Sequence, residues 1–225
     1  MMNHDSLEKK GLLMALLVTL LISVGGLVEI IPLYAVKAAV PPIEGVKPYT
    51  ALELEGRDLY IREGCYNCHT QMVRPFRDET ERYEGPYSKA GEFVYDRPFQ
   101  WGSKRTGPDL HRVGGKYRDS WHYIHMNNPR DTSPGSIMPN YPWLLKNTLD
   151  TRSTQDKMRV LKGLGHPYTD EEIAGAAESM KRQGEAIVAS LKQDNITDAT
   201  PDKEIIALIA YMQRLGTDIG WRNAK

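Results

Sequence analysis

The sequence predicts a mostly α-helical protein in which one N-terminal transmembrane helix precedes a single larger helical domain. Three features predict this fold: a long apolar run, two amphipathic helix patterns that bracket the rest of the chain, and a Cys-x-x-Cys-His motif after the first of them. A chain of 225 residues has room for one membrane segment and one sizeable domain. We therefore divide it into an N-terminal segment 1–10, a membrane helix 11–36, a linker 37–49 and a domain 50–225.

The apolar run at residues 11–36 contains a single charged residue, Glu29. At about 1.5 Å per residue it can cross the roughly 30 Å hydrocarbon core of a bilayer with some tilt. A cleavable signal peptide is the alternative, but its apolar centre is usually about 7–15 residues long, and this run continues further before its first charge. We therefore expect a retained anchor. Thr19, Ser23 and Gly26 form a stripe of small residues on it, which lets a second transmembrane helix approach closely.

The linker contains three prolines and cannot be helical for long. The first helix of the domain then begins at Thr50, because Thr50 and Glu53 have the spacing of a capping box. Its inward face is narrow and ends near Gly64. The residues of that face are Leu52, Gly56, Leu59 and Tyr60.

The last helix is predicted to begin at Thr200-Pro201, a cap followed by a first-turn proline. Apolar residues then recur at helical spacing before Gly216. They are Ile205, Leu208, Ile209, Met212 and Leu215.

The motif Cys65-Tyr66-Asn67-Cys68-His69 contains both cysteines of the chain. Two thiols at this spacing can bond to the two vinyl groups of a haem while the imidazole binds its iron, which is the c-type attachment pattern. A redox-active cysteine pair would need a βαβ setting, and a zinc site would need two further ligands at fixed spacing. With no third cysteine, both alternatives are weakened, and we predict one covalent haem c held by Cys65, Cys68 and His69.

Charge gives no general clue to a partner. Lys plus Arg equal Asp plus Glu at 29 each, so nothing indicates nucleic-acid binding. Positive charges flank the membrane helix almost equally, and therefore they do not decide its orientation. Covalent haem attachment takes place on the outer face of the bacterial plasma membrane. We therefore expect a single-pass inner-membrane protein with a cytoplasmic N-terminus and a periplasmic haem domain.

The bracketing helices make the domain resemble class I cytochromes c. Gly56 and Tyr60 are similar to the small residue and the aromatic of that family's first helix, and Leu208-Ile209-Ala210-Tyr211 is similar to its closing helix. Gly107-Pro108-Asp109-Leu110 matches the family's Gly-Pro-x-Leu segment. The resemblance implies that the Pro108 carbonyl accepts the second ring N–H of His69, which would fix the tautomer of the ligand.

The sixth iron ligand is predicted to be Met138. It lies in the turn-rich loop Gly135-Ser136-Ile137-Met138-Pro139, after a predicted helix at 120–126, and this loop resembles the family's methionine loop. Met72 is too close to His69 in sequence to reach the opposite face of a haem, and Met212 belongs to the closing helix. The alternatives left open are Met126, Met158, Met180, His111, His122, His125 and His166.

Two segments exceed what a compact cytochrome needs, at about 71–106 and 144–199. The first is rich in aromatic residues, from Phe76 to Trp101, and could cover the haem edge, although we favour a docking surface for a larger subunit. The second is polar and compatible with helices at 150–164 and 169–195, where Thr169 and Glu172 have the spacing of a capping box.

Taken together, the span, the Cys65–Phe76 and Trp101–Leu110 stretches and the Ser136–Pro139 loop resemble the mono-haem subunit of cbb3-type cytochrome c oxidases, the CcoO or FixO family. The resemblance implies a non-catalytic subunit that takes electrons from a dihaem cytochrome c subunit. It passes them to haem b of the catalytic haem–copper subunit, within a proton-pumping complex that reduces oxygen to water. It also implies a calcium ion at the interface with the catalytic subunit, near Ser103.

Two other functions remain as alternatives. The cytochrome c subunit of a nitric oxide reductase shares the anchor and the haem but lacks the second insertion. A membrane-tethered haem sensor or peroxidase belongs to a different class, because it would need a vacant or weakly held sixth position on the iron.

Overall fold

The computed structural model describes residues 4–35, 40–102 and 104–224. The chain divides into two compact units, 1–42 and 43–225, which are described here separately. Helices account for the regular structure of the described residues, and the β-pairing among them is limited to one isolated bridge between Thr148 and Lys203. The described helices and 3₁₀ turns (η) are α1 (His4–Glu8), α2 (Gly11–Ala35), α3 (Ala51–Arg62), η1 (Cys65–Asn67), α4 (Arg77–Arg82), η2 (Ala90–Phe93), α5 (Asp119–Asn127), α6 (Pro129–Thr132), α7 (Trp143–Lys146), α8 (Thr154–Gly163), α9 (Asp170–Ala174), α10 (Ala176–Gln193), α11 (Glu204–Arg214) and η3 (Trp221–Ala224).

The N-terminal unit consists mainly of α2, which contains Pro32 near its end. Residues Gly11–Pro32 are long and apolar enough to cross a membrane, with a mean hydropathy of 2.5. The apolar side chains that cannot be buried within this unit, such as Leu12 and Leu21, are exposed, as suits a lipid-facing helix. The predicted run to residue 36 agrees with α2 as far as Ala35, because residue 36 lies outside the described residues.

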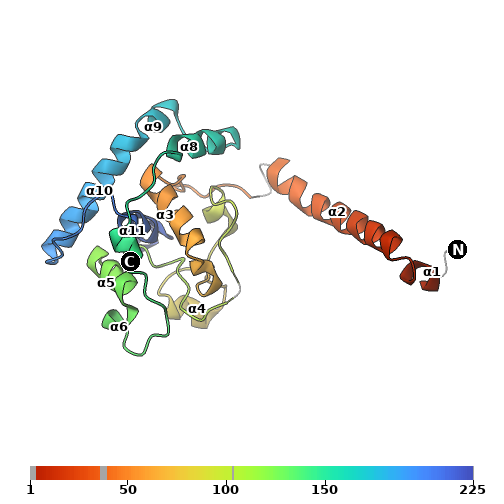
Figure 1. Cartoon of the computed structure of the whole chain (residues 1–225), viewed down its shortest axis with the longest axis horizontal. Helices are drawn as coiled ribbons and strands as arrows, with labels where there is room; N and C mark the ends of the chain where they lie inside the picture. The colour runs from red at the N-terminus through yellow and green to blue at the C-terminus, as the bar shows by residue number, and fades with distance from the viewer. Residues whose placement is uncertain (1–3, 36–39, 103, 225) are drawn as a thin grey trace. The chain divides into compact units, whose positions relative to one another are not determined.

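The second unit is organised around α3 and α11, which cross each other at its centre (Figure 1). Gly56 makes the crossing possible, because a Cβ at this position would lie 1.9 Å from the carbonyl oxygen of Ala207. The rings of Tyr60 and Tyr211 pack beside the crossing at 5.4 Å. Gly56 was predicted on the inward face of this helix, and its position there is confirmed by the close crossing of α3 and α11 that it permits.

Local capping explains where several helices begin. Thr50 and Glu53 form the predicted capping box at α3, and Thr169 and Glu172 form the one at α9. The prediction that Thr200 caps the last helix is wrong, since α11 begins at Glu204. The segment before it pairs instead with residues 147–149, through Leu149 N–H to Asp202 O at 2.8 Å and Glu204 N–H to Asn147 O at 3.2 Å.

The second insertion forms α7 to α10, and α10 packs against both α3 and α11. The helix predicted at 150–164 begins later, at Thr154, because the Asp150 carboxylate accepts the Arg152 N–H and holds a local turn. The helix predicted at 169–195 is divided into α9 and α10 at the single residue Gly175. The predicted helix at 120–126 is α5.

The aromatic insertion is folded rather than extended. Phe93 is 3% exposed and stacks on His111 at 4.5 Å, with Trp101 edge-on at 5.6 Å. Part of the segment is therefore core, which the preferred prediction of a docking surface missed. Three of its rings remain exposed and available for a partner: Phe76, Tyr87 and Phe99.

Candidate functional site

A cavity of about 610 Å³ lies in the second unit, and all five predicted haem-site residues line it. They are Cys65, Cys68, His69, Pro108 and Met138. One wall, which we call the proximal wall, consists of residues 64–69 and 106–113. The other, the distal wall, consists of lining residues of α5 and the loop 133–141, which α6 connects. The chain thus brings together residues that are more than seventy positions apart in sequence.

The proximal wall begins where α3 ends. Gly64 has a left-handed φ of +70°, which turns the chain into η1 and points the motif at the cavity. The amide N–H groups of Cys68 and His69 both donate to the Cys65 carbonyl, at 3.1 and 2.9 Å. The two thiols and the imidazole are therefore presented on one compact turn.

His69 is fixed from behind by the segment at Gly107. Its Nδ1 lies 2.8 Å from the Pro108 carbonyl, which can only accept, so Nδ1 carries the proton and Nε2 keeps its lone pair. This is the contact that the family resemblance implies. Burial lowers the pKa of His69, against the opposing effect of the Pro108 carbonyl, and this favours the neutral imidazole that an iron needs.

The backbone at Gly107 packs directly against the His69 ring. A Cβ at Gly107 would lie 2.2 Å from the Cε1 atom of the imidazole. The Gly107 N–H also donates to the Cys68 carbonyl at 3.0 Å. The glycine of the Gly-Pro-Asp-Leu segment is thus required by the close approach of backbone and ring.

Asp109 ties the two halves of the proximal wall together. Its buried carboxylate accepts the Thr70 hydroxyl at 2.6 Å and the Met72 N–H at 2.7 Å on one oxygen, and the His111 N–H at 2.8 Å on the other. Arg105 supplies a counter-charge 3.5 Å away. Sequence reasoning did not assign Asp109 a role, because its partners are identifiable only once the two segments are side by side.

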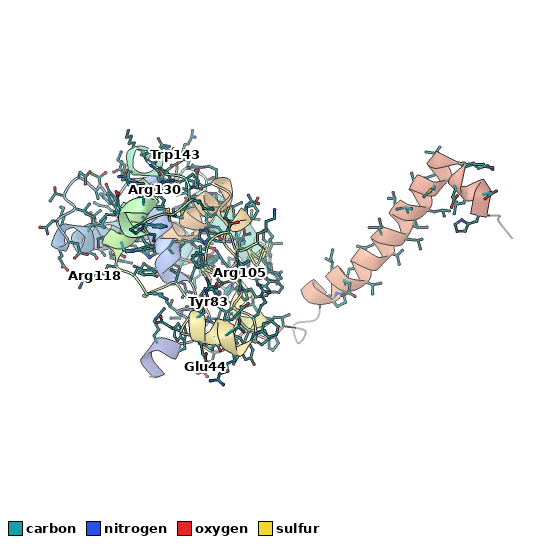
Figure 2. All side chains as sticks on the ribbon, turned by 90° about the horizontal axis from the view of Figure 1, so that it is seen from below. Glu44, Tyr83, Arg105, Arg118, Arg130 and Trp143 are labelled. Atoms are coloured by element: carbon teal, nitrogen blue, oxygen red, sulfur yellow. The ribbon has the colours of Figure 1, made fainter. Side chains whose placement is uncertain are left out.

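Arg105 extends this network toward the aromatic insertion. Its guanidinium binds both carboxylate oxygens of Glu79, at 2.7 and 2.9 Å, and lies over the ring of Tyr83 at 5.4 Å. Figure 2 labels Arg105 and Tyr83 close together on the domain. Tyr83 lines the cavity, and its hydroxyl accepts a hydrogen bond from the Asp109 N–H at 3.1 Å, which joins the aromatic insertion to the proximal wall. For this residue the alternative interpretation, that the insertion covers the haem site, fits best.

The distal wall carries Met138 on a loop with few bonds. Met138 is half-buried against the core, and its neighbour Ile137 is 79% exposed. The loop backbone is held by Met138 N–H to the Ser136 hydroxyl at 3.2 Å and by Arg130, which donates to the Met138 carbonyl at 3.2 Å.

The cavity separates the alternative sixth ligands into two groups. Met126, His122 and His125 line it together with Met138. Met158, Met180, His111 and His166 are not among its lining residues. Met158 lies in α8 and Met180 in α10, whereas His111 pairs with Glu92 at 3.0 Å. Met212, which the sequence assigned only to the packing stripe of the last helix, also lines the cavity.

The two histidines of α5 are neutral at ordinary pH. Burial, and then His125, lower the pKa of His122 to about 4. Burial, and then His69, lower the pKa of His125 to about 4. His122 is 1% exposed and neither of its ring nitrogens has a partner, which is costly for a buried polar side chain.

The two cysteines are free thiols, Cys65 half-buried and Cys68 exposed. Burial raises the pKa of the Cys65 thiol to about 12. Two thiols, an imidazole with a free lone pair and a thioether around one large cavity are the donor set that a covalent haem requires. The orphaned nitrogens of His122 also fit a bound group that brings polar atoms. The residues present therefore fit haem c.

The proposed calcium neighbour, Ser103, lies outside the described residues. Within residues 4–35, 40–102 and 104–224, no group of three or more His, Cys, Asp or Glu side chains could hold a metal ion. The calcium ion implied by the resemblance stays a prediction.

Comparison with known proteins gives one family. A family model described as cytochrome C oxidase, mono-heme subunit/FixO, matches residues 4–219. The match covers both the membrane helix and nearly all of the second unit. No curated protein matches the chain at a significant level.

Proposed function

This chain belongs to the mono-haem (FixO) family of cytochrome c oxidase subunits, and on that premise we propose that it is the electron-relay subunit of a cbb3-type oxidase. It would receive electrons from a dihaem cytochrome c subunit and pass them to haem b of the catalytic haem–copper subunit, where oxygen is reduced to water. The observation that carries the proposal is the single cavity lined by Cys65, Cys68, His69 and Met138.

Each residue has a separate task toward the haem. The thiols of Cys65 and Cys68 would hold the haem, each by addition across one vinyl group, a reaction that has no leaving group. His69 presents Nε2 to the iron because Pro108 holds its Nδ1 proton. Met138 offers a thioether from the distal wall. When bound, the haem supplies reversible one-electron chemistry, and a methionine ligand gives it a higher potential than a second imidazole would.

The relay also depends on the protein holding its haem close to the next cofactor. The cytochrome unit has no substrate machinery of its own, so its contribution is ligation, burial and orientation. We propose that α2 crosses the bacterial inner membrane once, with the N-terminus in the cytoplasm and the haem unit in the periplasm. The small-residue stripe of α2 and the exposed rings Phe76, Tyr87 and Phe99 would contact the larger subunit, and a calcium ion would lie at that interface.

Haem attachment is the first test. Haem should remain with the polypeptide after denaturation and acid–acetone extraction, and Cys65→Ser or Cys68→Ser should release much or all of it. Extractable haem in the unaltered chain would contradict the proposal. The soluble donor of electrons is not needed for this measurement.

Ligation is the second test. Met138→Ala should remove the weak near-infrared sulfur-to-iron charge-transfer band of the ferric protein. Met158→Ala and Met180→Ala are matched controls, because neither residue lines the cavity, and both should keep the band. Met126→Ala tests the other methionine of the distal wall. A band that survives Met138→Ala would assign the sixth position to another methionine.

The same preparations distinguish the relay from a haem sensor or peroxidase. A firmly six-coordinate carrier should show an unchanged ferrous visible spectrum when carbon monoxide is added. A sensor or peroxidase would bind the gas at once. Restoration of oxygen consumption to membranes that lack this chain then tests the assignment to an oxidase rather than to a nitric oxide reductase.

A further inference from the structure

His125 is held more firmly than any other imidazole on the distal wall. Its ring stacks on Trp121 at 4.4 Å with the planes only 12° apart, and Trp121 in turn stacks on Tyr117 at 4.1 Å. Trp121 and His125 lie one helical turn apart in α5, Tyr117 precedes the helix, and all three line the cavity. The column of rings fixes the plane of the His125 imidazole at the cavity wall.

A hydrogen-bond chain leads from a backbone carbonyl to the His125 ring. The Thr132 hydroxyl lies 3.2 Å from the Pro129 carbonyl and 2.6 Å from His125 Nδ1. When the hydroxyl donates its one proton to the carbonyl, its oxygen can only accept from the ring. In that arrangement Nδ1 of His125 carries the proton, and Nε2 keeps its lone pair. Histidines that bind metals are usually supported through their other ring nitrogen in this way.

The same support exists at His69, where the Pro108 carbonyl takes the Nδ1 proton at 2.8 Å. The two histidines belong to opposite walls of one cavity, and each is prepared from behind to offer Nε2. His122 lacks this preparation, because neither of its nitrogens has a partner among the described residues. Two of the cavity's three histidines are therefore built like metal ligands, and the proposed function uses only one.

Met138 is the ligand that can leave. The bonds at Met138 itself are a part-buried one from its N–H to the Ser136 hydroxyl and an exposed one from Arg130 to its carbonyl. Backbone bonds hold the loop on either side of it, at Ser136 and Tyr141, and Gly135 at φ +81° gives the backbone a flexible point nearby. His125, in contrast, is part of a packed helix. An iron that loses the sulfur would find a neutral imidazole already oriented on the same wall.

We propose that His125 is a reserve sixth ligand, which binds the haem iron through Nε2 when Met138 is displaced or chemically altered. The inference rests on the proposed function, since it needs a covalent haem between the two walls. Its consequence is that loss of the methionine changes the haem from histidine–methionine to bis-histidine ligation. The potential then falls and the iron stays closed, instead of opening to oxygen or other small ligands.

The test compares ferric full-length protein in mild detergent by electron paramagnetic resonance and visible spectroscopy. Met138→Ala should lose the charge-transfer band but remain low-spin, with the signature of two imidazole ligands. Met138→Ala combined with His125→Phe should become high-spin, because phenylalanine keeps the stack on Trp121 and offers no lone pair. The matched control is Met138→Ala with His122→Phe, which removes the other imidazole of α5 and should remain low-spin.

A gentler pair of variants covers the case in which His125→Phe prevents folding. Met138→Ala with Thr132→Val removes the hydrogen-bond acceptor but leaves the imidazole in place. The low-spin signal should then weaken into a mixture of spin states. Thr132→Val alone should leave the histidine–methionine spectrum unchanged.

The outcomes separate the two proposals. A high-spin Met138→Ala protein would overturn the reserve role while leaving the relay function intact, and so would a low-spin double variant with His125→Phe. If His125→Phe alone removes the low-spin state, His125 is the resident ligand and the reserve role is wrong. A parent chain without covalent haem or without the charge-transfer band would instead contradict the proposed function.

Discussion

The two walls of the haem cavity differ in how tightly they are built. On the proximal wall, Gly107 has no space for a methyl group beside His69, and the Asp109 carboxylate accepts three hydrogen bonds away from solvent. On the distal wall, Gly135 has nothing within 4 Å of the position of a Cβ, and the Met138 backbone makes one part-buried and one exposed hydrogen bond. The chain places one proposed iron ligand, His69, in a rigid setting and the other, Met138, in a less constrained one.

This difference has a chemical meaning. Thioether bonds from Cys65 and Cys68 would fix the haem to the proximal wall, so that its iron would stay beside His69. The distal ligand can then exchange without loss of the cofactor. The hydrogen bond from Thr132 to the Pro129 carbonyl suggests that the yielding wall still contains one prepared group, His125.

Replacing one glycine by alanine in each wall should give the largest difference between the two walls. Gly107→Ala should abolish or nearly abolish covalent haem, because the new Cβ would overlap the His69 ring and overpacking typically costs about 1–3 kcal/mol or more. Gly135→Ala meets no atoms and pays only for its left-handed φ, about 1 kcal/mol. The measurement is haem bound per polypeptide after acid–acetone extraction. Equal haem content in both variants would contradict the comparison.

Deletion of one polar side chain in each wall should give the next largest effect. Asp109→Ala leaves the Thr70 hydroxyl and two backbone N–H groups buried without their acceptor, and should lower the free energy of unfolding by about 3–5 kcal/mol. The distal counterpart is Asn140→Ala, which removes an exposed acceptor of Arg130 and should change it by less than about 0.5 kcal/mol. Denaturant unfolding of the detergent-solubilised protein, followed by circular dichroism, measures both. A small loss in Asp109→Ala would show that water replaces the carboxylate.

The sequence predicted those features whose cause lies within a few residues. The capping boxes at Thr50 and Thr169 are local, and so is the helix register that puts Gly56 against the last helix. The start of α11 was mispredicted, because long-range pairing with residues 147–149 outweighs a local cap at Thr200. In the second insertion the sequence predicted the presence of helices and the cap at Thr169, but not the later start of α8 or the break at Gly175.

The residues of the candidate site also divide into those that a local pattern predicts and those that depend on distant partners. The Cys65–His69 motif lies within five consecutive residues, so the sequence alone predicts its haem chemistry. Asp109, Thr132 and Tyr83 act through partners between 7 and 39 positions away, and no local pattern marks them. The lining role of Met212 was hidden by its helical spacing, because a residue can belong to a packing stripe and to a cavity wall at once.

Acid should weaken the support of the proximal wall in a defined pH range. Glu92 is buried, which alone would raise its pKa, but hydrogen bonds from Arg112 and His111 lower it to about 2. A folded-state pKa below the unfolded value of 4.5 adds stability above pH 4.5, and this is lost as the pH falls toward about 2. A shift of that size corresponds to about 3 kcal/mol.

Glu92→Gln should therefore be less stable than the parent at pH 7, and the gap should narrow between about pH 4.5 and 2. Asp131→Asn on the distal wall is the control, since this exposed carboxylate bonds only to the nearby Asn128 amide among the contacts described for it. Its unfolding curve should stay parallel to the parent's. If the Glu92→Gln gap stays constant through the acid range, the carboxylate does not stabilise the wall as an ion.

The smallest expected effect concerns the tether of the distal loop. Arg130 donates to Asn140 at 2.6 Å and to the Met138 carbonyl at 3.2 Å, and both contacts are exposed to solvent. Arg130→Ala should therefore lower stability by no more than about 0.5–1 kcal/mol. If the same free energy holds Met138 in place, external imidazole should bind the ferric haem roughly 2–5 times more readily. Arg118→Ala, which removes an exposed ion pair with Asp194 away from the loop, should leave imidazole binding unchanged. An Arg130→Ala protein that binds imidazole like the parent would show that the loop is held by its packing against the core, and the distal wall would then be less yielding than its hydrogen bonds indicate.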